Sequence, residues 1–440
     1  MNDERYVAAI EISSSKIMAA IGIMHADGRL DIIATEQEKG VESVRYGIIQ
    51  NLEETSMRIN RVLDRLQAKP QVAPREITAL YVGLSGRSLR SITTESDLNL
   101  PDDTEITDDI LNRLREQALS TAIDSSLEVI DAIPRIYTVG KLETRSPKGA
   151  IGSKIKATYD LIVCRPELRR NLQRCIADKV GVDIAGFVVT ALSTAQVILS
   201  SEEKRLGCML VDMGAETTTV SIYKDGSLRY FATLPLGGRN ITRDITSLSL
   251  LEERAEEIKM SMGNALARDA GSFNVNGVKS SDVSNLVVAR SEEIVANVVE
   301  QLKYAGLKDN DLPAGLICIG GASQLNGMIE LLKRSTDLPV RTGQLPSYIH
   351  LTDTKIPSFE VLQTASVLYS GANQTDDECL EMPGAQELPV TGEGNSDETR
   401  TDTPHKPQKP RKDGFMKKWG TRISELFGGP ADDDSDLIDE

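Results

Sequence analysis

One pattern of strands and turns occurs twice in this chain, and it constrains the fold more than any other feature. Each copy has a short apolar segment that ends in an acidic residue, a turn of small polar residues, and two more apolar segments joined by Asp-Gly. The first copy runs through 6–11, 13–15, 16–24 and 30–35, and the second through 208–212, 214–218, 219–223 and 228–234. Short apolar runs bounded by such turns predict antiparallel strands. The repetition predicts two similar lobes that face one another across a cleft.

The remaining periodic segments mix helices with strands. We expect helices over 52–69, 251–267, 325–334 and 360–369, and strands over 77–83 and 314–319. Strands that alternate with helices along the chain indicate an α/β fold.

Two of the turns have the composition of phosphate-binding loops. The first contains Ser13, Ser14, Ser15 and Lys16 after Glu11, and the second contains Gly214, Ala215, Glu216, Thr217 and Thr218 after Asp212. Small residues in a tight turn expose backbone N–H groups that bind phosphate, and a preceding carboxylate holds Mg²⁺ through water. Either turn alone is equally consistent with an ordinary hairpin, but the pair predicts loops that grip phosphates from opposite sides.

Two further groups are candidate ligand contacts. Gly320, Gly321, Ala322 and Ser323 lie between an expected strand and an expected helix, where glycine allows a flat ligand to approach the backbone closely. The alternative is a turn that starts a helix with Ser323 as its cap. Glu256 and Lys259, three residues apart, share one face of the expected helix over 251–267.

Composition narrows the class of partner. The formal net charge of −16 argues against nucleic acid, because phosphates would be repelled. The five cysteines include no CxxC pair, so we expect reduced thiols and neither a zinc site nor a disulfide framework. The first residues show no signal-peptide pattern, and no apolar run approaches the roughly 18 residues of a spanning helix. We therefore expect the folded body in the cytoplasm.

The C-terminal region predicts a membrane anchor. Residues 373–412 are polar and rich in proline and glycine, which is typical of a disordered linker. At about 100° per residue, the segment 413–428 forms a helix with an aromatic side and a basic side. The first carries Phe415, Met416, Trp419, Ile423, Leu426 and Phe427, and the second carries Lys417, Lys418 and Arg422. Such a helix lies in the interface of an anionic membrane, although docking in a partner's groove is the alternative.

Several motifs resemble those of the FtsA family of bacterial cell division proteins, within the actin, sugar-kinase and DnaK superfamily. The run 10–16 stands where the family has Asp-Ile-Gly-Thr/Ser-Ser-Lys, and 236–245 is close to its Gly-Gly-x-x-Ile-Thr-x-Asp-Ile run, which includes Gly237 and Gly238. Residues 255–259 match Ala-Glu-x-x-Lys, whose Glu and Lys contact the nucleoside in the family. The resemblance covers nearly all of residues 5–372.

The resemblance implies an actin-like fold of two lobes around a nucleotide cleft. The first lobe would comprise 1–83 with 166–200 and 353–372, interrupted by an inserted subdomain at 84–165. The second would comprise 201–245 with 312–352, and a further subdomain at 246–311. The linker at 373–412, the amphipathic helix at 413–428 and an acidic tail at 429–440 would follow.

The chain also departs from the family pattern. Glu11 replaces an Asp, Ser13 replaces a Gly, Ala215 and Glu216 stand where further glycines are usual, and Thr219 replaces an Asp. The resemblance therefore implies binding of ATP with Mg²⁺ and at most weak hydrolysis. Glu11 and Asp212 are the candidate catalytic residues, since they would position Mg²⁺ and water.

The resemblance implies a division protein that binds ATP and forms filaments on the cytoplasmic face of the inner membrane. It would anchor the FtsZ ring at the septum and contact other division proteins. The alternatives are a small-molecule kinase, a chaperone-like ATPase and a pilus-assembly protein like PilM. Residues 84–165 show no sugar-binding signature, which argues against a kinase, and the C-terminal tail is too short and polar for the substrate domain of a chaperone. The terminal helix argues against a PilM-like protein, which lacks one.

Overall fold

The computed structural model describes residues 4–267, 274–275, 278–353 and 355–383. Its first lobe is built on a six-stranded sheet with the order β12-β7-β1-β2-β3-β20. The strands are β1 (Arg5–Ile12), β2 (Lys16–Met24), β3 (Leu30–Lys39), β7 (Ala79–Leu84), β12 (Asp183–Val189) and β20 (Ile349–Leu351). β1 is antiparallel to β2 and parallel to β7, so it lies in the middle of the sheet.

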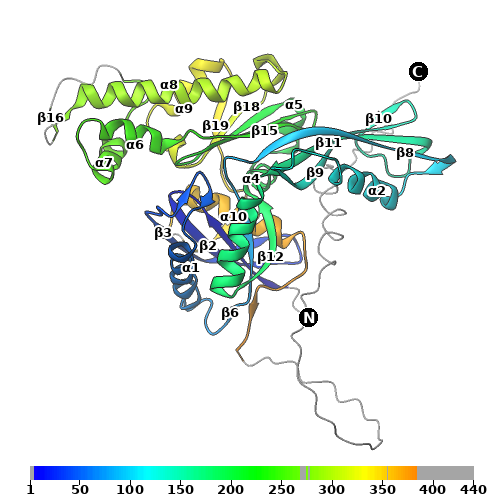
Figure 1. Cartoon of the computed structure of the whole chain (residues 1–440), viewed down its shortest axis with the longest axis horizontal. Helices are drawn as coiled ribbons and strands as arrows, with labels where there is room; N and C mark the ends of the chain where they lie inside the picture. The colour runs from blue at the N-terminus through cyan, green and yellow to red at the C-terminus, as the bar shows by residue number, and fades with distance from the viewer. Residues whose placement is uncertain (1–3, 268–273, 276–277, 354, 384–440) are drawn as a thin grey trace, which may run out of the picture.

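The second lobe repeats this strand order. Its strands are β13 (Cys208–Met213), β14 (Thr218–Lys224), β15 (Ser227–Leu234), β18 (Gly315–Ile319) and β19 (Val340–Thr342). The order β15-β14-β13-β18-β19 corresponds strand for strand to β3-β2-β1-β7-β12, including the parallel pairing of the central strand with the fourth. The predicted repetition is therefore confirmed, and in Figure 1 the second lobe lies above the first.

A third group of strands extends the sheet of the second lobe. It contains β8 (Arg90–Glu105), β9 (Glu128–Val139), β10 (Leu142–Thr144) and β11 (Ile151–Cys164), and α2 (Asp108–Leu119) packs against it. β8 joins β15 through one pair, Arg90 with Ala232. These strands are inserted in the sequence of the first lobe, yet they form one nine-stranded sheet with the second lobe and project to its side (Figure 1).

The helices cover the two central sheets. Those of the first lobe are α1 (Leu52–Gln67), α3 (Pro166–Gln173), the π-helical turn η1 (Arg174–Val180), α4 (Thr190–Ile198) and α10 (Ser358–Ala372). Those of the second are α5 (Ser201–Leu206), α6 (Gly238–Thr246), α7 (Glu252–Met262), α8 (Ser280–Tyr304), α9 (Met328–Thr336) and the short turns η2 (Asp309–Asp311) and η3 (Gly321–Gln324). One set of alternate residues of β13, β14 and β18 packs with α6–α9 in a second core. The other set, which includes Leu210, Tyr223 and Ile317, belongs to the same buried cluster as the first lobe.

Short two-stranded pairs complete the fold. They are β4 (Val44–Arg45) with β5 (Ile48–Ile49), β6 (Glu76–Ile77) with β21 (Leu380–Glu381), and β16 (Asn274–Val275) with β17 (Val278–Lys279). No helix among the described residues is long and apolar enough to cross a membrane.

Two predicted helices have different bounds in the structure. The helix expected over 251–267 ends at Met262, because Gly263 leaves the helical conformation and caps it by donating to the Lys259 carbonyl. The helix expected over 325–334 begins at Met328. Gly327, which precedes it, has a φ of 78°, a left-handed conformation that interrupts a helix.

Two predicted boundaries also differ. The range 312–352, assigned to the second lobe, includes β20, which pairs with β3 in the first lobe. The start of the linker predicted at residue 373 is wrong, since Cys379 and Leu380 are buried and β21 pairs with β6. The predicted membrane helix at 413–428 and the acidic tail at 429–440 lie outside the described residues.

Candidate functional site

Glu11 and Asp212 occupy corresponding ends of β1 and β13. In the strand pairings, Glu11 lies opposite Met18 and Asp212 lies opposite Thr219. Burial raises the pKa of Glu11 to about 8, with a further contribution from Asp212 and an opposing one from Lys16. Burial also raises the pKa of Asp212 to about 6, against the effects of Gln363 and Lys16. The two carboxylates thus affect one another across the boundary between the lobes.

Asp212 has one bonded and one free carboxylate oxygen. Its Oδ2 accepts a hydrogen bond from Nε2 of Gln363, which comes from α10 of the opposite lobe. Its Oδ1 is buried without a hydrogen-bond partner. That atom faces Gly320, where an added Cβ would lie 2.7 Å from it, and Gly320 has a φ of 86°. Both facts explain why glycine is needed at this position.

These two carboxylates fit a hydrated divalent cation. Within the described parts of the chain, no three His, Cys, Asp or Glu side chains are arranged to hold a metal ion. An ion bound here would take most of its ligands from water or phosphate oxygens, as Mg²⁺ does. The free Oδ1 of Asp212 and the raised pKa values of both acids are consistent with a cation at this place.

The first turn is closed by its own hydrogen bonds. The backbone N–H and the hydroxyl of Ser13 both donate to the Lys16 carbonyl, at 2.9 Å each. Ser14 Oγ accepts from the Gly47 N–H at 3.3 Å, and Ser15 Oγ lies 3.5 Å from Ser13 Oγ. Lys16 Nζ donates to the Glu360 carbonyl at 2.8 Å and lies 3.5 Å from its carboxylate, so α10 fixes this ammonium group.

The second turn packs against the start of α6. The N–H groups of Gly238 and Arg239 donate to the carbonyls of Gly214 and Ala215, at 3.0 and 2.7 Å. A Cβ on Gly237 would lie 2.5 Å from the Ala215 carbonyl, so only glycine fits there. Within the turn, Gly214 N–H donates to the Thr217 carbonyl and the Thr218 hydroxyl donates to the Leu236 carbonyl. Thr218 therefore has a structural role in the turn.

Glu216 of the second turn is held by donors from both lobes. Its carboxylate accepts from Arg45 at 2.8 Å and from the Tyr46 N–H at 2.7 Å, both from the first lobe. It also accepts from Arg239 at 3.3 Å and Arg243 at 2.7 Å on α6. The side chain of Glu216 is 1% exposed. We call this arrangement the Glu216 clasp, and it directly joins the two lobes.

Burial raises the pKa of Glu216, but the Tyr46 N–H, the hydrogen bond from Arg45, the charge of Arg239 and the Ser14 hydroxyl together outweigh burial. The pKa consequently lies below its ordinary value, and the clasp holds a charged carboxylate. The involvement of Ser14 shows that the two turns face one another. The charge of Glu216 is thus balanced by arginine side chains.

A second polar group lies beside Gly238. Lys259 Nζ contacts the Glu256 carboxylate at 2.6 Å, the Thr242 hydroxyl at 2.9 Å and the Gly238 carbonyl at 3.2 Å. The Lys259 side chain is 13% exposed and the Glu256 side chain 42%, so the ammonium group is the buried partner of this pair. A Cβ on Gly238 would lie 3.1 Å from that of Ala322, which brings the turn 320–323 to the same place.

Ser323 in the turn 320–323 does not have the role of helix cap that one interpretation gave it. Ser323 is buried, and its hydroxyl donates to the Gly320 carbonyl at 2.7 Å, so it neither caps α9 nor faces outward. Gly321 is exposed, and an added Cβ there would meet no atom within 4 Å. The open side of this turn is therefore at Gly321.

Contacts thus link all the predicted site segments of the two lobes. Sequence reasoning missed the residues that hold them: Gln363, Glu360, Thr242, Arg45, Arg239 and Arg243. The sequence signal for part of this set was the spacing of Arg239 and Arg243, which lie four residues apart and therefore on one helix face.

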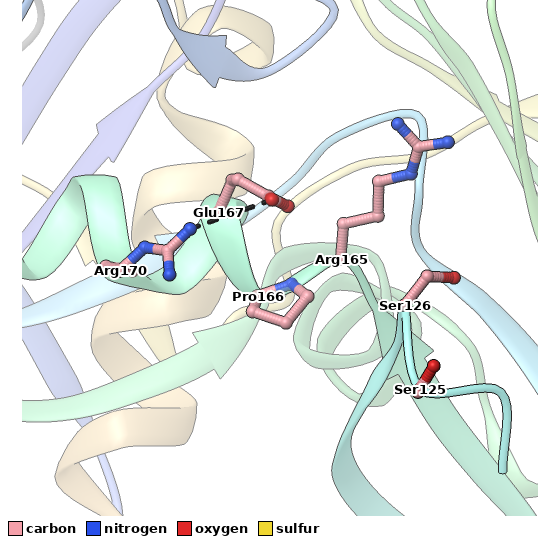
Figure 2. A pocket seen from close by; sticks show the side chains of 6 residues that line it. All are labelled: Ser125, Ser126, Arg165, Pro166, Glu167 and Arg170. Atoms are coloured by element: carbon pink, nitrogen blue, oxygen red, sulfur yellow. Dashed lines mark ion pairs between the residues drawn. The ribbon is translucent and has the colours of Figure 1, made fainter.

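A surface pocket lies elsewhere, where α3 meets the loop before β9. It is lined by Ser125, Ser126, Arg165, Pro166, Glu167 and Arg170. Figure 2 shows Glu167 turned toward Arg170, at a distance of 3.6 Å. None of the predicted site residues lines this pocket.

Comparison with known proteins identifies the family. A model described as "Cell division protein FtsA" matches residues 209–359, and one described as "SHS2 domain inserted in FTSA" matches 86–163. The cell division protein FtsA of Porphyromonas gingivalis is 32% identical over 341 residues, which cover 74% of this chain and 70% of that protein. This chain belongs to the FtsA family. The FtsA of Pseudomonas aeruginosa is 28% identical over 396 residues, covering 87% of this chain and 93% of the relative.

Membership in the FtsA family makes the chain an actin-like cell division protein. Among solved structures, the PilM–PilN complex of type IV pilus biogenesis is similar, with a TM-score of 0.57 and 14% identity. The likeness covers 83% of this chain and 96% of that one. At this identity the likeness shows a shared fold alone.

Proposed function

We propose that this protein binds ATP with Mg²⁺ between its two lobes. The observation that carries the proposal is that Glu11 and Asp212, at equivalent ends of β1 and β13, interact electrostatically beside turns whose backbone is closely packed at Gly237 and Gly320. Glu11 and Asp212 would hold Mg²⁺ through water, which would neutralise phosphate oxygens. Ser13–Lys16, Gly214–Thr218 and Gly237–Gly238 would surround the phosphates. Glu256, Lys259 and Gly320–Ser323 would contact the nucleoside.

The chain's own groups suit this task. Lys259 and Glu256 offer a donor and an acceptor next to open space at Gly321, where a flat ring can approach the backbone. The arginines of the clasp bring positive charge to the gap between the turns. Hydrolysis would be weak, because Lys16 and Asp212 are already bonded to Glu360 and Gln363 of α10.

Titration calorimetry of the full chain with ATP and Mg²⁺ tests the nucleotide site. We expect saturable binding that Lys259→Met weakens. Glu257→Gln, on the exposed side of α7, is the matched control and should bind as the unmodified protein does. Absence of ATP binding by the unmodified protein would refute the proposal.

We further propose that the protein forms filaments on the cytoplasmic face of the inner membrane and anchors the FtsZ ring at the septum. Family membership supports the division role, and the composition of 413–428 supports an amphipathic anchor. Three cations near an anionic leaflet contribute about 1 kcal/mol each, so one chain would bind reversibly and a filament more firmly.

Flotation with vesicles that contain anionic lipid tests the anchor. Deletion of 413–428 should abolish co-flotation, whereas deletion of the acidic segment 429–440 should preserve it. Equal flotation of the two deletion variants would contradict the membrane assignment, and it would leave the nucleotide proposal untouched.

A further inference from the structure

The Glu216 clasp contains more positive charge than its carboxylate neutralises. Three guanidinium groups surround one buried carboxylate. The other acids beside the clasp are Glu252, 3.5 Å from Arg239 with its side chain 53% exposed, and Glu42, whose charge acts on Arg45. Arg45 and Arg243 are 40% and 37% exposed, so they reach the carboxylate from the rim of the gap between the lobes. A second anion could therefore approach them from solvent.

The first lobe has an unusual backbone conformation at the two residues, Tyr46 and Gly47, that lie next to Glu216 and Ser14. Tyr46, whose N–H donates to Glu216, has a φ of 51°, which is rare for a residue with a side chain. Gly47 follows with a φ of 79°, and a Cβ there would lie 2.4 Å from the Ser85 carbonyl. Gly47 also donates to Ser14 of the first turn. Strained backbone of this kind marks positions where a specific geometry is required.

The clasp occupies the gap between the two turns that the proposed function assigns to phosphates. Glu216 is itself a residue of the second turn, and Ser14 of the first turn contributes to holding its charge. A carboxylate and a phosphate present similar oxygen acceptors to an arginine fork. An anionic side chain held there by arginine thus resembles a bound phosphate group in charge and in hydrogen bonding.

We propose that Arg45, Arg239 and Arg243 form a phosphate-binding site that Glu216 occupies as an internal competitor. This inference rests on the proposed nucleotide function and adds its regulation. Binding of a nucleotide requires Glu216 to yield arginine contacts to phosphate oxygens, so occupancy of the site is coupled to the contact between the lobes. The affinity for phosphate-bearing nucleotides is therefore set by the clasp.

The test compares ATP with adenosine, which has no phosphate, by titration calorimetry of the full chain. Glu216→Gln removes the competing charge and keeps the side chain's size. We expect it to raise the affinity for ATP on the order of tenfold, within the usual range of coupling between sites, and to leave adenosine unchanged. Equal ATP affinity of the unmodified protein and the variant, or an equal gain for adenosine, would overturn the inference.

A second variant keeps the inference testable if Glu216→Gln does not fold. Arg243→Gln removes one guanidinium from the rim and should weaken ATP binding severalfold without affecting adenosine. The control is Arg341→Gln, because Arg341 is 41% exposed and pairs with Glu203 elsewhere in the second lobe. Unchanged ATP binding by Arg243→Gln would overturn the inference alone. If the unmodified protein binds neither ATP nor adenosine, the proposed function fails as well.

Discussion

The buried carboxyl of Glu11 predicts that this protein loses stability as the pH rises through neutrality. The pKa of Glu11 is raised from 4.5 to about 8, chiefly by burial. The folded state therefore binds this proton more tightly than the unfolded state does. Its contribution to stability is complete below about pH 4.5 and is lost as the pH rises through about 8. Glu11→Gln imitates the protonated carboxyl and does not ionise.

The size of the effect follows from the two pKa values. Compared with a side chain that does not ionise, the raised pKa of Glu11 lowers the free energy of unfolding by about 1 kcal/mol at about pH 5 and by about 4 kcal/mol at about pH 7.5, from 1.36 kcal/mol per pKa unit. Glu11→Gln should remove that cost. The gain in free energy of unfolding over the unmodified protein should consequently grow by about 3 kcal/mol between the two conditions.

Urea unfolding of the full chain without nucleotide or Mg²⁺ measures this difference at both pH values. Glu360→Gln is the matched control, because the effects of Lys39 and Lys16 outweigh burial and lower the pKa of Glu360. Removing the charge of Glu360 should lower the free energy of unfolding at the higher pH, whereas Glu11→Gln should raise it. A gain for Glu11→Gln that is the same at both pH values would refute the assignment of a protonated, buried Glu11.

Three other substitutions test the site and the fold. Lys259→Met should weaken ATP and adenosine alike by about 1.5–3 kcal/mol in calorimetry, since its three polar contacts are lost. Gly320→Ala should lower the free energy of unfolding by about 1–3 kcal/mol because of its φ of 86° and the nearby Met213 carbonyl, whereas Gly321→Ala should have little effect. Leu380→Ala should cost about 2–5 kcal/mol in urea unfolding if β21 belongs to the folded body.

The repeated strands could be predicted because their signal is local. Each apolar run and each turn lies in a few consecutive residues, and the acid at the end of the first strand marks the equivalent point in each lobe. The joining of β8 to β15 could not be predicted, because it depends on one pair of residues far apart in the sequence. The bounds of α7 and α9 depended on Gly263 and Gly327, which the apolar periodicity does not weigh.

Some residues of the candidate site could likewise be predicted from the sequence, and others could not. The residues in the turns were predicted from composition and resemblance, but the residues that hold them come from distant segments. Gln363 and Glu360 lie on α10, and Arg45 lies on β4, so only the folded chain brings them to Asp212, Lys16 and Glu216. A pattern in one sequence carries no information on which distant arginine neutralises a buried acid.

The attachment of β21 determines where a pull on the C-terminal segment would act. Cys379 donates from its N–H to the Tyr6 carbonyl at 2.9 Å, and its own carbonyl accepts from the Thr78 N–H at 2.9 Å. Tension applied beyond Glu381 would thus load the start of β1 as shear before it reached the other lobe. Glu11 lies near the far end of that same strand, so a pull on the C-terminal segment would reach the candidate site along residues 6–11 of β1.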